Sequence, residues 1–555
     1  MENLITTQKS LSDLIGQFES GTLAIPEIQR DVVWDSDQVR SLVESINLGY
    51  PCGSLILWEP REKDKSLVRS MIRPERLDQN DGVPPRYFLL DGQQRLTAIA
   101  SVLLKRDKLK DILCELEEDM PYIYVNLKKL PRQMEATTDS GGYKYPWVLM
   151  NRLYDGSIER DDEFNRLSPE DRDTIRKYTQ GFRDYQFPLQ IIRDRDYATV
   201  AEIFTLVNSQ GTQLTGAEIH LARIVPHWRG ITSEFRDYRL QLRQRNYDLD
   251  LTFLMRAVTI IECQVPQIKK LAERVAKDKP TRRHLDETWR KAKSAMDKLI
   301  RLLQRDLSLD KSKYVVSKNS LVALIYYLAN ERSRRPAVST VLRFFVLSQL
   351  SQHYSAAAES ALRRDFRILT DPSVTPRQGL SELVEVVAGE ARQAYRGMKI
   401  PPGKVNGLPS RNVILMLMYL VMRDRQATDW GSGKVRGLDE IEPKDMQLHH
   451  IFPFNFMTTD KAAQKLCKES EYTPAEFRTE VNDIANLTFL GREKNAAIAD
   501  IPPWQYLPNE TTKEMRKAHF IPEDPELWKL SSFSQFLTAR RELIAKAMTS
   551  LIKSL

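Results

Sequence analysis

The sequence has few cysteines, and none is placed to form a common zinc site. Its four cysteines are Cys52, Cys114, Cys263 and Cys467, with no Cys-x-x-Cys motif among them. A structural zinc held by cysteine pairs is therefore not expected, and neither is a disulfide framework. Scattered thiols of this kind are typical of a reducing compartment, so we expect a cytoplasmic protein.

Long apolar segments are also absent. The longest apolar run, 413–422, has ten residues, whereas a helix that crosses a bilayer needs about 20. The first residues, Met-Glu-Asn-Leu-Ile-Thr-Thr-Gln, show no basic stretch followed by an apolar one, so no secretory signal is predicted. We expect a soluble protein with no membrane partner, in which 413–422 is a buried helix.

Neither a strong charge excess nor a P-loop is present. Lys and Arg number 83 against 75 for Asp and Glu, which gives +8 over 555 residues. This balance permits nucleic-acid binding without predicting it. No Gly-x-x-x-x-Gly-Lys-Ser/Thr run occurs, so nucleotide hydrolysis would need another architecture. The composition is that of an ordinary globular protein, and the length predicts two to four domains.

The pattern of elements predicts an α+β, multidomain chain with three parts. Residues 1–235 mix strands and helices, 236–400 are predicted to be helical almost throughout, and 401–555 hold a hairpin in a mainly helical setting. The Pro- and Gly-rich stretch 400–409 marks the last boundary. The middle part shows no catalytic pattern. Arg332, Arg334 and Arg335 could contact phosphate there, although a solvated helix end is the commoner interpretation.

Local patterns define several elements in the N-terminal third. Residues 8–18 are predicted to form a helix, and a capping box of Asp35 and Gln38 begins another that stops at Gly49. Residues 53–58 read as a strand. The stretch 135–147, rich in Gly, Ser and Thr, is predicted to be a loop.

Two histidines and two asparagines near the C-terminus have the spacing of a nuclease site. The run Gln-Leu-His449-His450-Ile-Phe-Pro453 is followed by a polar insert and then by Asn486-Leu-Thr-Phe-Leu-Gly-Arg-Glu-Lys-Asn495. Phosphodiester cleavage needs a base that activates water and a cation that holds the developing charge. A His-His pair alone is more often packed than catalytic, but Pro453 and the two asparagines favour a site on a short strand, a loop and a helix.

Each of these residues has a predicted role. His450 is the general base, because imidazole is largely neutral near physiological pH yet basic enough to take a proton. His449 and Asn495 would hold one divalent ion, such as Mg²⁺ or Mn²⁺. Asn486 would tie the hairpin loop together and orient the imidazole of His450. This run resembles the HNH superfamily, specifically its DUF1524 branch, which implies a ββα-metal fold. Many HNH enzymes have Asp or Glu where this chain has His449.

A second informative stretch joins a strand to a helix through a glycine turn. The apolar residues 87–90 lead into Asp91-Gly92-Gln93-Gln94-Arg95, and an amphipathic helix follows. Free N–H groups at such a helix start can bind an anion. Arg95 could grip a phosphate, and Asp91 could hold a metal or position a catalytic water. The spacing alone also fits a strand-turn-helix connection that binds no ligand, and such connections are common.

Three blocks of the N-terminal part together resemble the DUF262 family. They are Ile-Pro-x-x-Gln29-Arg30-x-x-x-Trp, the Asp-Gly-Gln-Gln-Arg motif, and a Phe, Asn and Gly block at 203–219 that includes Asn208. The resemblance covers about residues 8–225 and implies a fold related to ParB and sulfiredoxin. It also implies binding and hydrolysis of a nucleoside triphosphate by Asp91, Gly92, Gln93, Gln94 and Arg95. By the same resemblance, Gln29, Arg30 and Asn208 flank that pocket, and the base of the nucleotide stays open.

A chain that carries both resemblances is similar to GmrSD-type type IV restriction enzymes, which cut modified DNA. They imply an anti-phage DNA endonuclease whose HNH cleavage is gated by a nucleotide-binding N-terminal domain and directed at modified phage DNA. One alternative is a nucleotide- or DNA-sensing module with a non-catalytic HNH domain that acts through partners. Another is an RNA-directed nuclease. A single HNH site cuts one strand at a time, so a double-strand break would need a homodimer or two visits.

Overall fold

The computed structural model describes most of the chain. The described residues are 4–26, 34–62, 85–112, 121–130, 134–137, 144–196, 199–200, 203, 215–225, 227–228, 230–331, 337–407, 413–431, 436–442 and 444–555. They divide into two compact units, the first formed by 1–234 with 275–282 and the second by 235–274 with 283–555. The protein is thus a mixed α and β chain, as predicted.

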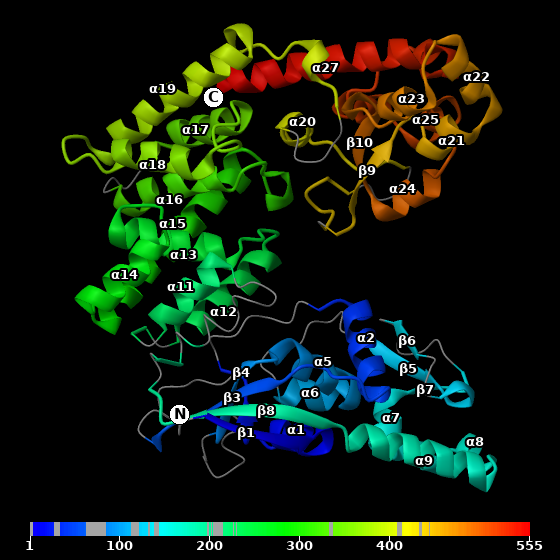
Figure 1. The fold of residues 1–555 in the computed structure, drawn as a ribbon. Helices are drawn as coiled ribbons and strands as arrows, with labels where there is room; N and C mark the ends of the chain where they lie inside the picture. The colour runs from blue at the N-terminus through cyan, green and yellow to red at the C-terminus, as the bar shows by residue number, and fades with distance from the viewer. Residues whose placement is uncertain are drawn as a thin grey trace. The chain divides into compact units, whose positions relative to one another are not determined.

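A five-stranded mixed sheet forms the centre of the N-terminal unit (Figure 1). Its order is β1 (Leu4–Ser10), β8 (Gln186–Arg193), β3 (Leu55–Glu59), β4 (Tyr87–Asp91) and β2 (Leu23–Ala24). The pairs β1–β8 and β3–β4 are antiparallel, whereas β8–β3 and β4–β2 are parallel. The mixed pairing places the end of β4, at Asp91, beside the start of β3.

A smaller sheet corrects one sequence prediction. Its three antiparallel strands are β6 (Met134–Thr137), β5 (Tyr122–Asn126) and β7 (Trp147–Leu149). The predicted loop over 135–147 is therefore wrong at both ends, because β6 and β7 each pair with β5. The polar composition of 135–147 does not predict strands. These strands are stabilised by pairing with β5 rather than by their own residue types.

The helices of the N-terminal unit follow the local patterns with one shift. The predicted capping box at Asp35 is confirmed, and the helix behind it buries one apolar face. The helix predicted over 8–18 begins instead at Leu11, because 4–10 pair with β8 and Ser10 caps the helix. The helices are α1 (Leu11–Glu19), α2 (Ser36–Asn47), α5 (Gln93–Leu103), α6 (Arg106–Ile112), α7 (Met150–Tyr154), α8 (Asp162–Asn165), α9 (Pro169–Arg183) and α11 (Gly216–Ile224).

The predicted helical middle is confirmed. Its elements are α12 (Ile231–Gln244), α13 (Leu251–Cys263), α14 (Lys269–Asp278), α15 (Arg282–Asp306), the 3₁₀ helix η3 (Ser312–Tyr314), α16 (Asn319–Asn330), α17 (Val338–Leu350), α18 (Ala358–Leu369) and α19 (Pro376–Ala394). The apolar run 413–422 is buried in α20 (Val413–Asp424), as predicted. Arg332, Arg334 and Arg335 lie outside the described residues.

The C-terminal part places a two-stranded hairpin among short helices. The strands are β9 (Met446–His450) and β10 (Leu487–Gly491). The helices are α21 (Phe454–Thr459), α22 (Lys461–Glu469), α23 (Pro474–Val481), the 3₁₀ helix η6 (Ile484–Asn486), α24 (Arg492–Ile498), α25 (Pro503–Glu510), α26 (Lys513–Ala518) and α27 (Phe533–Ser554). In Figure 1 the long helix α27, drawn in red, runs past α20 and α23.

Residues of the helical middle pack directly on this hairpin. The ring of Tyr314 lies 5.3 Å from that of Phe489 on β10, and Lys313 Nζ donates to the carbonyl oxygen of Met446 on β9 at 3.3 Å. Near the predicted boundary, Gly407 N donates to Asp483 Oδ2 at 3.1 Å. Both parts therefore lie in one compact unit, and a separate domain over 401–555 stays a prediction.

Two further features bear on the sequence analysis. No helix among the described residues has the length and apolar character needed to span a membrane. Within the same residues, Cys52, Cys263 and Cys467 are not joined in disulfides.

Candidate nuclease site

The hairpin brings the histidine pair to one end of β9, with α24 directly after β10. His449 lies opposite Thr488, and His450 lies opposite Leu487. Because side chains alternate along a strand, the two histidines point to opposite faces. His449 is buried at 2% exposure, whereas His450 is only half-buried. The strand that was predicted to carry the pair is confirmed.

A hydrogen bond to Asn482 fixes the tautomer of His450. The Nδ2 group of Asn482 donates to the carbonyl oxygen of Arg478 at 3.0 Å, so its Oδ1 faces His450 Nε2 at 2.9 Å. His450 Nε2 must therefore carry the ring proton, which leaves Nδ1 as a base. Burial lowers the pKa of His450, and the hydrogen bond with Asn482 opposes that effect only in part. The ring is neutral at physiological pH.

Asn482 was not among the predicted site residues, and the residue predicted to orient His450 was Asn486. The structure gives that contact to Asn482, which ends α23 four residues earlier. Asn482 could have been noticed as a helix-ending asparagine inside the polar insert. Its contact with His450 depends on how the insert folds back.

Asn486 holds the loop that leads into the hairpin. This fully buried side chain accepts from Phe452 N at 2.9 Å and donates to the carbonyl oxygens of Phe452 and Val481, at 2.9 and 2.8 Å. These bonds join the end of β9 to the start of β10. Asn486 therefore sets the path of the loop, while its contacts within the described residues do not include His450.

His449 and Asn495 face each other with two electron-rich atoms. The hydroxyl of Tyr506 donates to Ile451 O at 2.8 Å, so its oxygen accepts from His449 Nε2 at 3.2 Å. Burial lowers the pKa of His449 to about 4, the contact with Asn495 opposes that effect, and nearby His450 and Arg540 add to it. In the neutral tautomer with its proton on Nε2, the bare Nδ1 lies 2.8 Å from Asn495 Oδ1.

In that tautomer the two atoms are both electron-pair donors, which suits a cation. In the other tautomer Nδ1–H donates to Asn495 Oδ1, and in a third arrangement the amides of Asn495 and Gln447, joined by a 2.6 Å hydrogen bond, both turn round. The tautomer fixed by Tyr506 is the one that a metal-binding histidine needs, with its second nitrogen donating to a neighbour. The residues therefore fit a divalent ion held through His449 Nδ1 and Asn495 Oδ1.

The ligand set is a sparse one. Among the described residues, no group of three or more His, Cys, Asp or Glu side chains is placed to hold a metal ion. One imidazole and one amide oxygen would leave most positions around an ion to water and substrate. A catalytic metal site needs such open positions, whereas a structural site closes them.

Arg540 and His519 support the hairpin from behind. Arg540 on α27 is fully buried and donates to the carbonyl oxygens of Ala485 at 2.6 Å and His519 at 3.1 Å. His519 Nε2 in turn donates to Thr428 O at 2.7 Å, so its Nδ1 accepts from the hydroxyl of Thr488 on β10. Neither residue was predicted from the sequence, because the neighbouring residues do not indicate that an arginine or a histidine is buried and binds backbone carbonyls.

The Asp-Gly-Gln-Gln-Arg motif in the N-terminal unit is built around Arg95. Its guanidinium donates to Cys52 O at 2.7 Å, Ser54 O at 2.9 Å and Asp91 Oδ2 at 3.1 Å. The fork that was predicted to grip a phosphate thus joins the segment before β3 to the end of β4. Gly92 is the N-cap of α5 and makes no side-chain cap hydrogen bond; the first turn of a helix is where backbone N–H groups can bind an anion.

The remaining residues of the predicted nucleotide pocket are only partly described. Gln93 and Gln94 are buried in the first turn of α5, and Asp91 is partly exposed at the end of β4. Gln29, Arg30 and Asn208 lie outside the described residues, so their place beside this turn stays a prediction.

Gly92, the single glycine of the motif, is expected to tolerate no side chain. Its φ is +92°, and an added Cβ would lie 2.2 Å from Leu55 Cδ2. We expect Gly92→Ala to destabilise the N-terminal unit by about 2–4 kcal/mol in urea unfolding, from left-handed strain and overpacking together. The control Gly181→Ala, in helix α9 with open space around it, should stabilise the unit by about 0.5–1 kcal/mol. Equal effects of the two would contradict this account.

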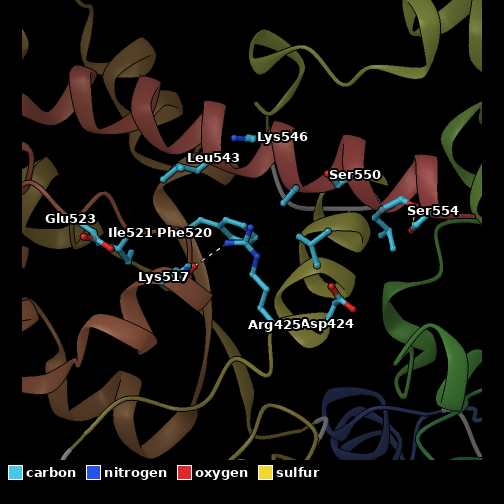
Figure 2. Close-up of a pocket in the computed structure, with 13 residues that line it drawn as sticks. Asp424, Arg425, Lys517, Phe520, Ile521, Glu523, Leu543, Lys546, Ser550 and Ser554 are labelled. Carbon is cyan, nitrogen blue, oxygen red and sulfur yellow. Dashed lines mark hydrogen bonds between the residues drawn. The ribbon is translucent and has the colours of Figure 1, made fainter.

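A separate pocket of about 630 Å³ lies between α20, α27 and the segment after α26 (Figure 2). Arg425 donates to Lys517 O at 3.2 Å across it, and its guanidinium lies 4.3 Å from the ring centroid of Phe520. Asp424 and Glu523 line the same pocket. Its charges are therefore mixed, and its arginine is already engaged within the protein.

Comparison with known families relates the N-terminal part to restriction endonucleases. Residues 11–225 match the family described as GmrSD restriction endonuclease, N-terminal domain. These are nearly the residues over which the three sequence blocks predicted a resemblance. The hairpin site at 446–498 lies outside the match.

One curated relative extends over the whole chain. The uncharacterized protein MJ0686 of Methanocaldococcus jannaschii is 20% identical, in an alignment that covers 98% of this chain and 99% of that protein. Its description gives no activity, so the function of this chain is argued from the site.

Proposed function

We propose that the protein is a DNA endonuclease of anti-phage defence that cleaves phosphodiesters at the β9–β10 hairpin and is gated by a nucleoside triphosphate bound to the N-terminal unit. The observation that carries the proposal is that a base and a pair of cation ligands involve adjacent residues, His449 and His450, at the end of β9. His450 offers a base nitrogen whose tautomer is fixed, and His449 with Asn495 offers two cation ligands. The N-terminal match to a restriction endonuclease domain supports the substrate class.

The chain's own groups would act as follows. His450 Nδ1 takes a proton from water, whose oxygen bonds to phosphorus as one ester P–O bond breaks; the leaving oxygen takes a proton from solvent. Asn482 keeps the ring of His450 in the required tautomer. Asn486 holds the loop that positions both strands. A divalent ion on His449 and Asn495 would neutralise charge that develops on the phosphate.

Gating is proposed to begin at the turn that joins β4 to α5. The uncapped first turn of α5 is suited to phosphate oxygens. Asp91, tied to Arg95, would position a metal or a water there, and nucleotide binding would shift the chain between an inactive and an active state. Without such control, a nuclease of this kind would also attack the DNA of its host.

The test is a cleavage matrix with purified full-length protein. Wild type and His450→Ala are incubated with Mg²⁺, Mn²⁺ or EDTA, with each nucleoside triphosphate in turn, and with plain or phage-modified DNA. Cleavage by the wild type alone, dependent on metal, nucleotide and modification, supports the whole proposal. Cleavage without nucleotide removes the gating. Nucleotide hydrolysis without cleavage of any DNA favours a sensing module, and cleavage of RNA alone favours an RNA-directed nuclease.

A further inference from the structure

The charged residues that line a pocket in the helical middle are all positive. It encloses about 1100 Å³ between the second half of α15, the start of α17 and the start of α19. Four of its lining residues are cations, namely Lys298, Arg301, Arg305 and Arg377, and none of the described residues that line it is acidic.

These cations are largely without partners. Arg305 pairs with exposed Asp306 at 2.7 Å, whereas Lys298, Arg301 and Arg377 form no ion pair within the described part of the chain. Positions 298, 301 and 305 lie on one face of α15, and like charges at such spacing repel by about 0.2–0.5 kcal/mol per pair. Lys298, Arg301 and Arg305 are exposed, so their charges are accessible to an anion.

The part of the same helix before Lys298 shows the opposite pattern. There Arg283 and Arg290 both pair with Glu287, at 3.4 and 3.7 Å, and Asp297 binds Arg245 at 2.6 Å. The charges of 269–293 are of both signs, which is typical of a solvated helix face. From residue 298 to 305 the sign no longer alternates, because Lys298, Arg301 and Arg305 are the charged residues there.

The rest of the lining is also suited to phosphate. Helix α17 begins at Val338 without a side-chain cap, and Val338, Ser339 and Thr340 of its first turn line the pocket. The described lining has no aromatic side chain on which a base could stack. The cations of α15 extend over about 10 Å along the helix, which matches several phosphates of a DNA strand at about 3.4 Å of helix axis each.

We infer that this pocket binds the phosphate backbone of duplex DNA and anchors the substrate without reading its sequence. The inference rests on the proposed function, since it takes DNA as the substrate. Arginine forks and a lysine ammonium group contact phosphate oxygens, and such contacts position a protein on DNA without base recognition. The mixed-charge pocket of Figure 2 has no comparable excess.

The test measures binding of the full-length chain to a fluorescent 30-base-pair duplex in EDTA, where no cleavage occurs. The pocket variant is Lys298→Gln/Arg301→Gln/Arg305→Gln. The matched control, Arg283→Gln/Arg290→Gln/Lys291→Gln, removes the same charge from exposed positions of the same helix. Because each lost phosphate contact reduces the slope of log K against log salt by about 0.9, the pocket variant should lose about 2–3 units of slope and at least about tenfold in affinity at 0.1 M salt. The control should bind like wild type.

Several outcomes overturn the inference. The first is that the pocket variant binds DNA as tightly as the control, and the second is that the wild type binds no DNA. The third is that ATP competes with DNA for the same residues, and the fourth is that these residues make the protein bind duplex RNA more tightly than duplex DNA. The binding and cleavage results are separable. Pocket-dependent binding without any cleavage would refute the proposed function alone, whereas cleavage with unchanged binding by the pocket variant would refute this inference alone.

Discussion

DNA cleavage by His450→Ala is expected to be about 10²–10⁴-fold slower than by wild type, the usual contribution of a general base. The fold should tolerate the change, because His450 is half-buried and the hydrogen bond described for its side chain is the one to Asn482. The measurement is the single-turnover rate at saturating protein, with the melting temperature recorded beside it. His227→Ala, at an exposed histidine, is the matched control and should cut like wild type.

The pH dependence of wild-type cleavage gives an independent check on the same residue. The neutral form of His450 is the active base, so the rate rises as pH rises through its pKa. Burial lowers that pKa from its ordinary value of 6.5, so the acid limb of the profile should lie below 6.5. Rates at pH 6.5 and pH 8 should therefore differ by less than about twofold. A midpoint above 6.5 would mean that another group limits the reaction.

Arg540→Met is expected to give the largest loss of stability in the C-terminal unit. The fully buried guanidinium donates to carbonyl oxygens that have little access to water. Burial lowers the pKa of Arg540 to about 9, so the group is still charged at pH 7. Removing a buried charge is favourable by itself, but leaving each carbonyl unmatched costs about 1–3 kcal/mol. The net loss should be about 2–4 kcal/mol, because several carbonyls lose their donor together.

Calorimetry of the full-length protein should show this as a melting transition lowered by at least about 4 °C. Lys546→Met is the matched control, since Lys546 is exposed on the same helix, and its melting temperature should stay within about 1 °C of wild type. A second variant, Arg540→Lys, keeps the charge but lacks the planar fork and should fall between the two. An Arg540→Met protein as stable as wild type would show that the carbonyls find other donors.

The site itself was only half readable from the sequence. His449, His450, Asn486 and Asn495 carry their meaning in residue type and spacing, so the short strand and the helix after it could be predicted. Tautomers cannot be read from spacing, because they depend on which atom each ring nitrogen faces. Asn482 and Tyr506 decide the tautomers of the two histidines, and both approach from segments whose path the local sequence does not specify.

The N-terminal motif shows a different kind of limit. A glycine turn with a following arginine predicts an anion site equally well whether the arginine faces outward or inward. The structure turns Arg95 inward, because Gly53 and Gly92, at φ of +79° and +92°, leave space for its guanidinium and nearby carbonyls accept its N–H groups. The phosphate site that is proposed at this turn would therefore rely on the backbone of α5 rather than on the guanidinium of Arg95.

The sequence by itself determined what local periodicity and capping encode. It specified the helical middle, the capping box at Asp35, the buried helix at 413–422 and the strand that carries the histidine pair. Only the tertiary structure decided the small sheet at 134–149, the bond between Asn482 and His450, the carbonyl contacts of Arg540 and the one-signed pocket on α15. Each of these depends on groups that are distant in the chain, and their contacts form only when the helices and strands pack together.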